Sequence, residues 1–219
     1  MATGTPLTAD DFHSLTAVSR ETLARLEAYA ALLARWQSRI NLVGPATLRD
    51  PWRRHFLDSA QLLPYLPEST RRLADLGSGA GFPGLVLAIM GVPDVHLIES
   101  DQRKVAFLRA VAGETGTPVT IHATRIEALS GLEADVITAR ALAPLASLLD
   151  YALPLLRSQG GSKGACLFLK GQQVEPELAA ASARWSMTVE RLASRSDPTG
   201  VILRLGAFSP LSHPLAPGL

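Results

Sequence analysis

A glycine-rich stretch constrains the fold of this chain more than any other feature of its sequence. Residues 73–84 read LADLGSGAGFPG, a short apolar run followed by four glycines within eight residues. Glycine lets the backbone turn sharply and lets a ligand approach the main chain, and a helix that begins there offers its positive end to the ligand. The stretch therefore predicts a strand that runs into a ligand-binding turn, in preference to a tight turn without a ligand.

The spacing of these glycines fits two kinds of cofactor. Gly79, Gly81 and Gly84 have the G-x-G-x-x-G spacing of dinucleotide sites, and Glu99 follows at a suitable distance to bind a ribose. Asp75, just ahead of the first glycine, favours the other kind. Its carboxylate would repel a pyrophosphate but would suit the ammonium group of a methionine moiety. We therefore expect S-adenosylmethionine as the cofactor, with NAD as the alternative.

From residue 71 onward, short apolar runs alternate with amphipathic segments. The runs predict strands at 72–76, 95–98, 119–121, 135–138 and 166–169. The segments between and after them predict helices at 82–91, 101–115, 144–157 and 173–183. Two final runs, 187–192 and 201–205, flank the turn SDPTG and predict an antiparallel hairpin. The expected fold is α/β, a Rossmann-like class I methyltransferase with a mostly parallel seven-stranded sheet that ends in this hairpin.

Residues 1–70 read as a helical extension that packs on this core. Leucines and alanines at three- and four-residue steps predict a helix from about residue 20, Thr8 begins a capping box, and Pro51 starts a further helical stretch that ends near Pro64. The methyltransferase core would then span 71–208. The end of the chain, 209–219, contains three prolines and is expected to be a flexible tail.

The composition narrows the class of protein. A chain of 219 residues with 47% apolar residues can close a sizeable core, and its formal charge of +1 means that any RNA affinity must come from local patches. Cys166 is the only cysteine, and the histidines lack ligand spacing, so neither a disulfide nor a structural metal is expected. No apolar run reaches about 18 residues, and the N-terminus does not resemble a secretory signal. We expect a cytoplasmic protein without a membrane span.

Polar side chains follow several of the predicted parallel strands. In open α/β sheets the ligand crevice lies at the carboxyl ends of the strands, so these residues should meet at one edge. We expect Glu99 to accept hydrogen bonds from the ribose hydroxyls. Arg125-Ile126-Glu127 could frame the adenine, with Ile126 against the ring face, but taken alone these three residues fit the start of a surface helix better. The predicted site comprises Asp75, Gly77, Gly79, Glu99, Ile126, Glu127, Arg140 and Lys170.

The combination of motifs closely resembles the bacterial RsmG family, also called glucose-inhibited division protein B. This family methylates N7 of a guanine in small-subunit ribosomal RNA. The resemblance covers about residues 20–175 in order. Its motifs are Trp36, Asn41-Leu42, Arg54–Ser59, Asp75–Gly84, Arg103–Leu108, Arg125–Glu127, Arg140-Ala141 and Leu169–Gln172.

The resemblance implies roles for individual residues. Contacts with S-adenosylmethionine are implied for Gly77, Phe82, Ile126, Glu127 and Arg140, and RNA-facing positions for Arg103, Lys104 and Lys170. The implied partner is 16S ribosomal RNA or the small subunit, with the enzyme acting as a monomer. Arg54 belongs to a group of arginines that could line an RNA-facing rim. Glu99 stands where the family also has aspartate, which should preserve ribose binding.

The residues available also constrain the chemistry. Methylation of cytosine C5 needs a cysteine nucleophile, but Cys166 lies at the start of its predicted strand, away from the expected site. Methylation of exocyclic amines commonly uses an acidic or amide residue and two prolines after the fourth strand, where this chain has Arg140-Ala141-Leu142. Guanine N7 offers a lone pair and needs no general base. We expect Arg140 or Lys170 to orient the guanine and His55 to be a packed histidine. An NAD-dependent oxidoreductase and a non-catalytic rRNA-binding assembly factor remain the alternatives.

Overall fold

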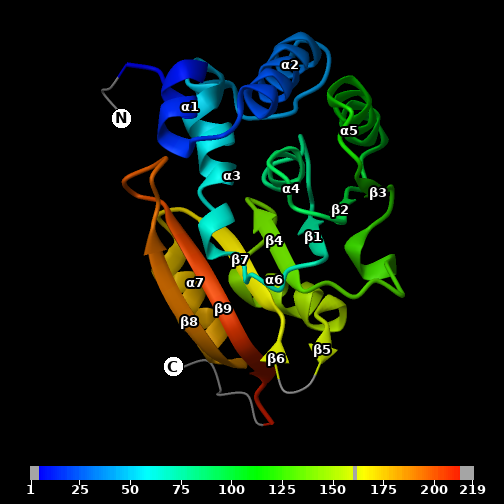
Figure 1. Ribbon diagram of the computed structural model, residues 1–219. Helices are drawn as coiled ribbons and strands as arrows, with labels where there is room; N and C mark the ends of the chain where they lie inside the picture. The colour runs from blue at the N-terminus through cyan, green and yellow to red at the C-terminus, as the bar shows by residue number, and fades with distance from the viewer. Residues whose placement is uncertain (1–4, 160–161, 213–219) are drawn as a thin grey trace.

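A seven-stranded sheet of order β3-β2-β1-β4-β7-β9-β8 forms the centre of the computed structural model, which describes residues 5–159 and 162–212 (Figure 1). The first five strands in this order pair in parallel, and β9 pairs antiparallel with both β7 and β8. The predicted topology is thus confirmed. The strands are β1 Leu73–Leu76, β2 Val95–Ile98, β3 Thr120–His122, β4 Val136–Arg140, β7 Ala165–Lys170, β8 Trp185–Ala193 and β9 Val201–Pro210.

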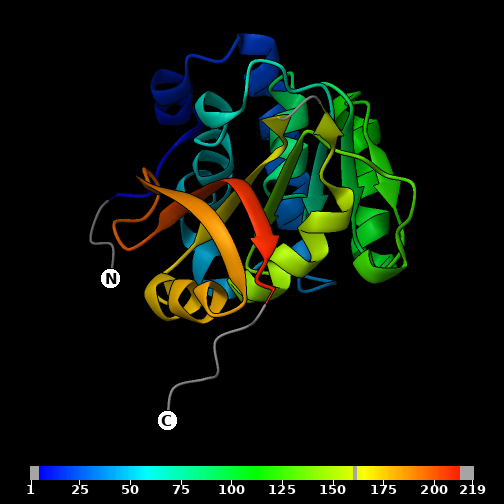
Figure 2. The ribbon, with the colours of Figure 1, turned by 90° about the horizontal axis from the view of Figure 1, so that it is seen from below.

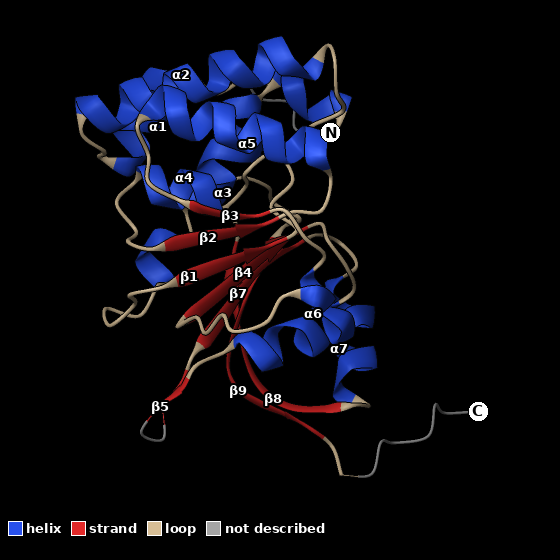
Figure 3. Ribbon diagram, turned by 90° about the vertical axis from the view of Figure 1, so that its right-hand side faces the viewer, coloured by secondary structure: helices blue, strands red, loops and turns tan. Residues whose placement is uncertain are grey.

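Helices cover both faces of the sheet (Figures 2 and 3). The helices α1 to α5 gather on one face and α6 and α7 on the other, and each layer encloses its own apolar cluster. Each described helix falls short of the length and apolarity that crossing a membrane requires. The helices are α1 Ala9–Thr16, α2 Arg20–Gln37, α3 Asp58–Ala60, α4 Gly84–Ile89, α5 Gln102–Thr115, α6 Leu145–Ala152 and α7 Val174–Ser182.

Several elements differ in detail from the sequence prediction. The stretch after Pro51 begins as a π-helical segment, η2 Trp52–Leu57, then becomes α3 and a final 3₁₀ turn, η3 Leu63–Tyr65. A two-stranded hairpin of β5 Ser158–Gln159 and β6 Ser162–Lys163 was not predicted. Further 3₁₀ turns are η1 Pro45–Arg49, η4 Ile126–Ala128 and η5 Leu153–Leu155.

The C-terminal strand is longer than its apolar run. Strand β9 continues to Pro210 because Phe208 is buried against Trp185, with ring centroids 5.7 Å apart. The strand therefore enters the segment 209–219 that was expected to be a tail, and residues 213–219 lie outside the described part of the chain.

The N-terminal helices share one apolar cluster with the sheet. Tyr29 of α2 is fully buried, stacks on Phe82 with ring centroids 5.1 Å apart, and donates its hydroxyl hydrogen to the carbonyl oxygen of Ala80. The extension thus touches the glycine turn directly. One apolar cluster includes residues on both sides of the boundary between 1–70 and 71–208. The division of the chain into two units at this boundary therefore stays a prediction.

One buried glutamine joins the loop between β8 and β9 to the N-terminal helices. Gln61 follows α3, and its Oε1 accepts the amide hydrogen of Arg195 at 2.7 Å. Its Nε2 lies 3.1 Å from Oδ1 of Asp58 and 3.2 Å from Oγ of Ser194. The loop of residues 194–200 is therefore held beside α3, as Figure 1 shows.

Replacing Gln61 with leucine should destabilise the fold by about 2 to 4 kcal/mol, because buried polar partners lose their hydrogen bonds. Chemical denaturation would measure the loss, and hydrogen exchange should be faster at the Arg195 amide. The exposed Gln102→Leu change on α5 is the matched control and should shift stability by less than about 0.5 kcal/mol. Equal stability of the two variants would contradict the prediction.

Candidate functional site

The glycine turn after β1 has positive φ angles, which glycine adopts more easily than other residues. Gly77, Gly79 and Gly81 have φ angles of +62°, +58° and +92°. A Cβ at Gly81 would lie 2.6 Å from the Tyr29 hydroxyl, whereas one at Gly79 would meet nothing closer than a backbone oxygen at 3.8 Å. The turn is thus packed from behind at Gly81 and open at Gly79, where a ligand can approach the main chain.

Asp75 forms the frame of this turn and does not line a cavity. Its carboxylate is fully buried, accepting the Thr138 hydroxyl hydrogen at 2.8 Å and the Gly84 amide hydrogen at 3.2 Å. Burial raises its pKa to about 6, against the lowering effect of these hydrogen bonds. The predicted contact between Asp75 and the ammonium of the cofactor is therefore not supported by this geometry, because the carboxylate faces helix α4.

A cavity of about 290 Å³ lies along the carboxyl ends of β1, β2 and β3. Glu99 lines it, with one carboxylate oxygen accepting from the Gly79 amide at 2.9 Å and the other from the Asp101 amide at 2.7 Å. Ile126 and Glu127, which the sequence analysis assigned to the cofactor site, line the same cavity. Hydrogen bonds from its own amide and from the Tyr151 hydroxyl lower the pKa of Glu127.

A larger cavity of about 740 Å³ meets the first one at the turn. The two share Gly77, Gly79, Lys104, Ala141 and Leu142 in their linings. Leu142 covers the junction, since a Cβ placed at Gly77 would lie 2.5 Å from its Cδ1. The two cavities therefore form one site with two compartments, which we call the small and the large cavity.

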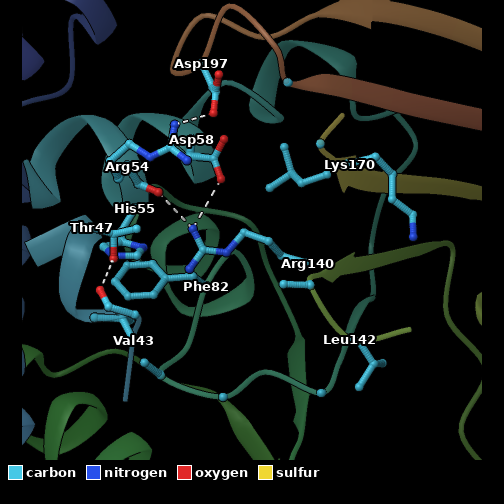
Figure 4. Close-up of a pocket in the computed structure, with 18 of the residues that line it drawn as sticks. Val43, Thr47, Arg54, His55, Asp58, Phe82, Arg140, Leu142, Lys170 and Asp197 are labelled. Atoms are coloured by element: carbon cyan, nitrogen blue, oxygen red, sulfur yellow. Dashed lines mark hydrogen bonds and ion pairs between the residues drawn. The ribbon is translucent and has the colours of Figure 1, made fainter. Parts of the chain in front are cut away.

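Three ion pairs surround the large cavity, and each joins a predicted cation to an acid that the sequence did not single out. Arg140 Nη1 lies 3.2 Å from Asp58 Oδ2, and Figure 4 shows this contact. The other two are Arg54 with Asp197 at 2.5 Å and Lys170 with Glu177 at 2.5 Å. The ammonium of Lys170 also donates to the Ala143 carbonyl at 2.8 Å and is largely buried, which makes it a brace and not an open RNA contact.

Arg140 lies on an aromatic stack. Its guanidinium carbon is 4.9 Å from the centroid of the Phe82 ring, and Phe82 also stacks on His55 with centroids 4.9 Å apart (Figure 4). This arrangement brings together Phe82 and Arg140, both predicted to contact the cofactor. Phe82 is itself buried and lines the large cavity, where its ring holds Arg140 in place.

His55 is a buried, neutral residue. Burial, with smaller effects of Arg140 and Arg54, lowers its pKa to about 3. Its Nε2 lies 2.8 Å from the Thr47 hydroxyl oxygen, whose hydrogen goes to the Gly44 carbonyl, so Nε2 donates. The expectation of a packed histidine agrees with this environment, and His55 is unsuited to general acid–base chemistry near pH 7.

The lowered pKa of His55 should make the stability of the fold depend on pH. Between pH 6.5 and pH 3 His55 is protonated in the unfolded chain but neutral in the folded chain. Its contribution to the free energy of unfolding is therefore fully present above pH 6.5 and is lost as the pH falls. His55→Phe should remove this loss. The difference in free energy of unfolding between wild type and variant should change by about 2 kcal/mol between pH 7 and pH 5, measured by urea denaturation. A constant difference would contradict this assignment.

The remaining predicted RNA contacts lie at the rim. Lys104 lines both cavities, and its ammonium makes no hydrogen bond or ion pair with other residues in 5–159 or 162–212. Arg103 is strongly exposed and pairs with Asp101 at 3.2 Å. Lys104 is thus the lining cation best placed to meet an incoming anion at the junction of the cavities.

Sequence reasoning missed the acidic half of the site. Asp58 lies within the family motif Arg54–Ser59 and Asp197 in the predicted turn SDPTG, but the sequence indicates no role for either acid. The available signal was weak, because each acid meets its cation across more than 80 residues of sequence.

The chain matches the model of the family described as "GidB: rRNA small subunit methyltransferase G" over residues 22–197. Several relatives bear the name ribosomal RNA small subunit methyltransferase G, and two of them illustrate the similarity. The one from Rhodospirillum rubrum is 60% identical over 91% of this chain and 98% of its own length. The one from Paramagnetospirillum magneticum is 60% identical over 88% of this chain and 92% of its own length.

Solved structures show the same fold at low sequence identity. The N-methyltransferase NodS from Bradyrhizobium japonicum in complex with S-adenosyl-l-homocysteine has a TM-score of 0.54 at 16% identity, covering 82% of this chain and 97% of that one. M. jannaschii TYW2 in complex with AdoMet has a TM-score of 0.54 at 14% identity, covering 80% of each chain. The family match decides against an NAD-dependent oxidoreductase. With its methyltransferase fold and its match across most of its length, this chain belongs to the rRNA small subunit methyltransferase G family.

Proposed function

We propose that this chain transfers the methyl group of S-adenosylmethionine to N7 of a guanine in the RNA of the small ribosomal subunit. The observation that carries the proposal is the meeting of two compartments at one glycine turn. The small cavity suits an adenosine, and the large cavity has room for a base extruded from RNA. The junction of the two cavities is where the methyl group and the base would meet.

The residues of the small cavity fit S-adenosylmethionine. Glu99 already accepts two backbone hydrogens, and its remaining lone pairs can accept from the two ribose hydroxyls. Ile126 provides an apolar surface for the adenine, and the open backbone at Gly79 lets the methionine moiety approach. When bound, the cofactor supplies an electrophilic methyl group on a sulfonium.

N7 methylation needs alignment more than proton transfer. The lone pair of N7 forms the new bond to carbon, the electron pair of the broken carbon–sulfur bond stays on sulfur, and the positive charge moves to the purine. No proton has to leave before attack. Proximity and orientation of N7 along the axis of the breaking bond therefore account for most of the catalysis expected here.

The lining of the large cavity supports this choice of reaction. Its described acids are in ion pairs, and His55 stays neutral down to about pH 3. Cys166 is fully buried in β7 outside both linings, and burial raises the pKa of its thiol. Attack by a cysteine at cytosine C5 and deprotonation of an exocyclic amine thus lack a suited side chain among the described lining residues.

The RNA would approach from the rim of the large cavity. We assign phosphate contacts to Arg103 and Lys104 and a wall of the substrate compartment to Arg54, with Lys170 bracing the loop after β4. The enzyme would act as a cytoplasmic monomer. In support, the large apolar side chains exposed in the described ranges, Leu15, Leu142 and Leu153, come from separate elements.

Methyl transfer to three substrates in parallel tests the proposal. Tritiated S-adenosylmethionine is supplied with naked small-subunit rRNA, with the small subunit, and with the assembled ribosome. We expect label in at least one of them, identified as N7-methylguanosine by mass spectrometry of the nucleosides. Label on another atom would overturn the reaction assigned, and tight RNA binding without label would identify a non-catalytic assembly factor.

A further inference from the structure

Arg140 and Asp58 form an ion pair in the lining of the large cavity. Arg140 ends β4, which pairs with β1 and so lies next to the glycine turn. Asp58 begins α3 on the N-terminal side of the cavity, and Figure 4 shows Arg140 reaching toward it. Both side chains are more than four-fifths buried and both line the large cavity.

Each member of the ion pair keeps hydrogen-bonding capacity. The hydrogen bonds that Arg140 makes with described residues all use Nη1, which lies 3.1 Å from the Arg54 carbonyl oxygen and 3.2 Å from Asp58 Oδ2. Nη2 and Nε of the guanidinium have no partner among the described residues, and neither is sealed from solvent. Within residues 5–159 and 162–212, Oδ2 of Asp58 accepts only from Arg140, whereas Oδ1 accepts from Ser196 and Gln61. A free donor therefore stands beside a free acceptor lone pair.

This order of donor and acceptor matches guanine. When N7 faces the methyl group, O6 is the next polar atom around the ring, followed by N1–H and the 2-amino group. O6 accepts a hydrogen bond, while N1–H and the 2-amino group donate. Adenine presents the reverse order at the first two positions, a donating 6-amino group and an accepting N1. Arg140 follows Ala139, which pairs in register with Leu76 directly before the glycine turn, whereas Asp58 begins α3 among the N-terminal helices. A donor beside the turn followed by an acceptor is the order that guanine needs.

We propose that Arg140 and Asp58 together select guanine, with Arg140 donating to O6 and Asp58 accepting from N1–H. The inference rests on the proposed function, because it takes N7 as the atom that faces the methyl group. The carboxylate has a second effect on the reaction. Methylation puts positive charge on the purine ring and strengthens N1–H as a donor, so the hydrogen bond to Asp58 grows stronger as the new bond forms.

A change of base at the target site tests the selection directly. The guanine that the wild-type enzyme methylates is first mapped and then replaced with 2,6-diaminopurine, which keeps N7 and the 2-amino group but reverses the hydrogen-bonding character at positions 6 and 1. The measured quantity is the ratio of kcat/KM for guanine over diaminopurine. We expect about 100-fold or more in favour of guanine for the wild type. A wild-type ratio near 1 overturns the proposal without any variant.

Two variants assign the selection to Asp58. In Asp58→Asn the amide nitrogen can donate to N1 of diaminopurine, so the ratio should fall by about 10-fold or more relative to the wild type. Asp197→Asn is the matched control: Asp197 lines the same cavity in an ion pair with Arg54, and its variant should leave the ratio unchanged. S-adenosylmethionine binding by calorimetry confirms that each variant is folded.

The outcomes separate this inference from the proposed function. If Asp58→Asn lowers kcat/KM for both bases by the same factor, Asp58 only supports the structure and the inference fails. A change of the ratio in Asp197→Asn would overturn the assignment to Asp58. If the wild type places no methyl group on N7 of any guanine, the proposed function itself fails, and that result is visible before a base is replaced.

Discussion

Replacing Gly81 with alanine is expected to destabilise the fold by about 3 to 5 kcal/mol and to abolish S-adenosylmethionine binding. Gly81 has a φ of +92°, which strains any residue with a Cβ. That atom would also lie 2.6 Å from the Tyr29 hydroxyl and 3.0 Å from Cβ of Leu85, and Tyr29 is fully buried and fixed by its stack on Phe82. Urea denaturation and calorimetric titration with the cofactor would measure the two losses.

Gly91 offers a control that has the backbone strain of a positive φ without steric crowding around a Cβ. It also has a positive φ, +102°, but a Cβ there would meet nothing within 4 Å. Gly91→Ala should therefore cost only about 1 kcal/mol and leave cofactor affinity unchanged. If Gly81→Ala behaved like Gly91→Ala, the contact of Tyr29 with the glycine turn would not be what shapes the cofactor site.

Replacing Glu99 with glutamine should weaken S-adenosylmethionine binding by about 100-fold. The carboxylate accepts from the amides of Gly79 and Asp101 with its two oxygens, and glutamine would turn an NH₂ group toward one of these N–H donors. The loss combines a weaker acceptor for the ribose hydroxyls with a displaced Gly79, and charge-assisted hydrogen bonds contribute about 1.5 to 3 kcal/mol each. Isothermal titration calorimetry would give the affinity.

Glu114 is the matched control for that experiment, because it lies exposed on α5. Glu114→Gln should bind the cofactor as the wild type does. Unchanged affinity in Glu99→Gln would instead mean that the ribose is held elsewhere in the small cavity.

The sheet could be predicted well from the sequence because its signals are local. The run 95–98 became strand β2 with the same bounds, and the alternation of strands and helices fixed a parallel core with an antiparallel end. The helix start at Thr8 was equally local, since its capping box closes within three residues. Such patterns depend on neighbours in the chain, which the sequence displays directly.

The side chains of the site were harder to predict, because their roles depend on distant contacts. The position of Asp75 at a strand end was correct, yet the sequence could not reveal that its carboxylate faces α4, where a Cβ at Gly84 would lie 2.6 Å from Cβ of Asp75. Lys170 was identified as a cation of the site, but Glu177 had to be placed before its ammonium could be seen as a brace.

The three ion pairs around the large cavity have a consequence for how the enzyme searches among RNAs. Affinity for nucleic acid without regard to sequence comes mainly from cations that neutralise phosphates and release counterions. Arg54, Arg140 and Lys170 already have carboxylates as internal counterions, so a stray phosphate gains little by entering. We expect short residence on wrong RNA and little salt dependence from these three residues. The enzyme would then leave unproductive encounters quickly, an advantage on a particle whose surface is largely phosphate.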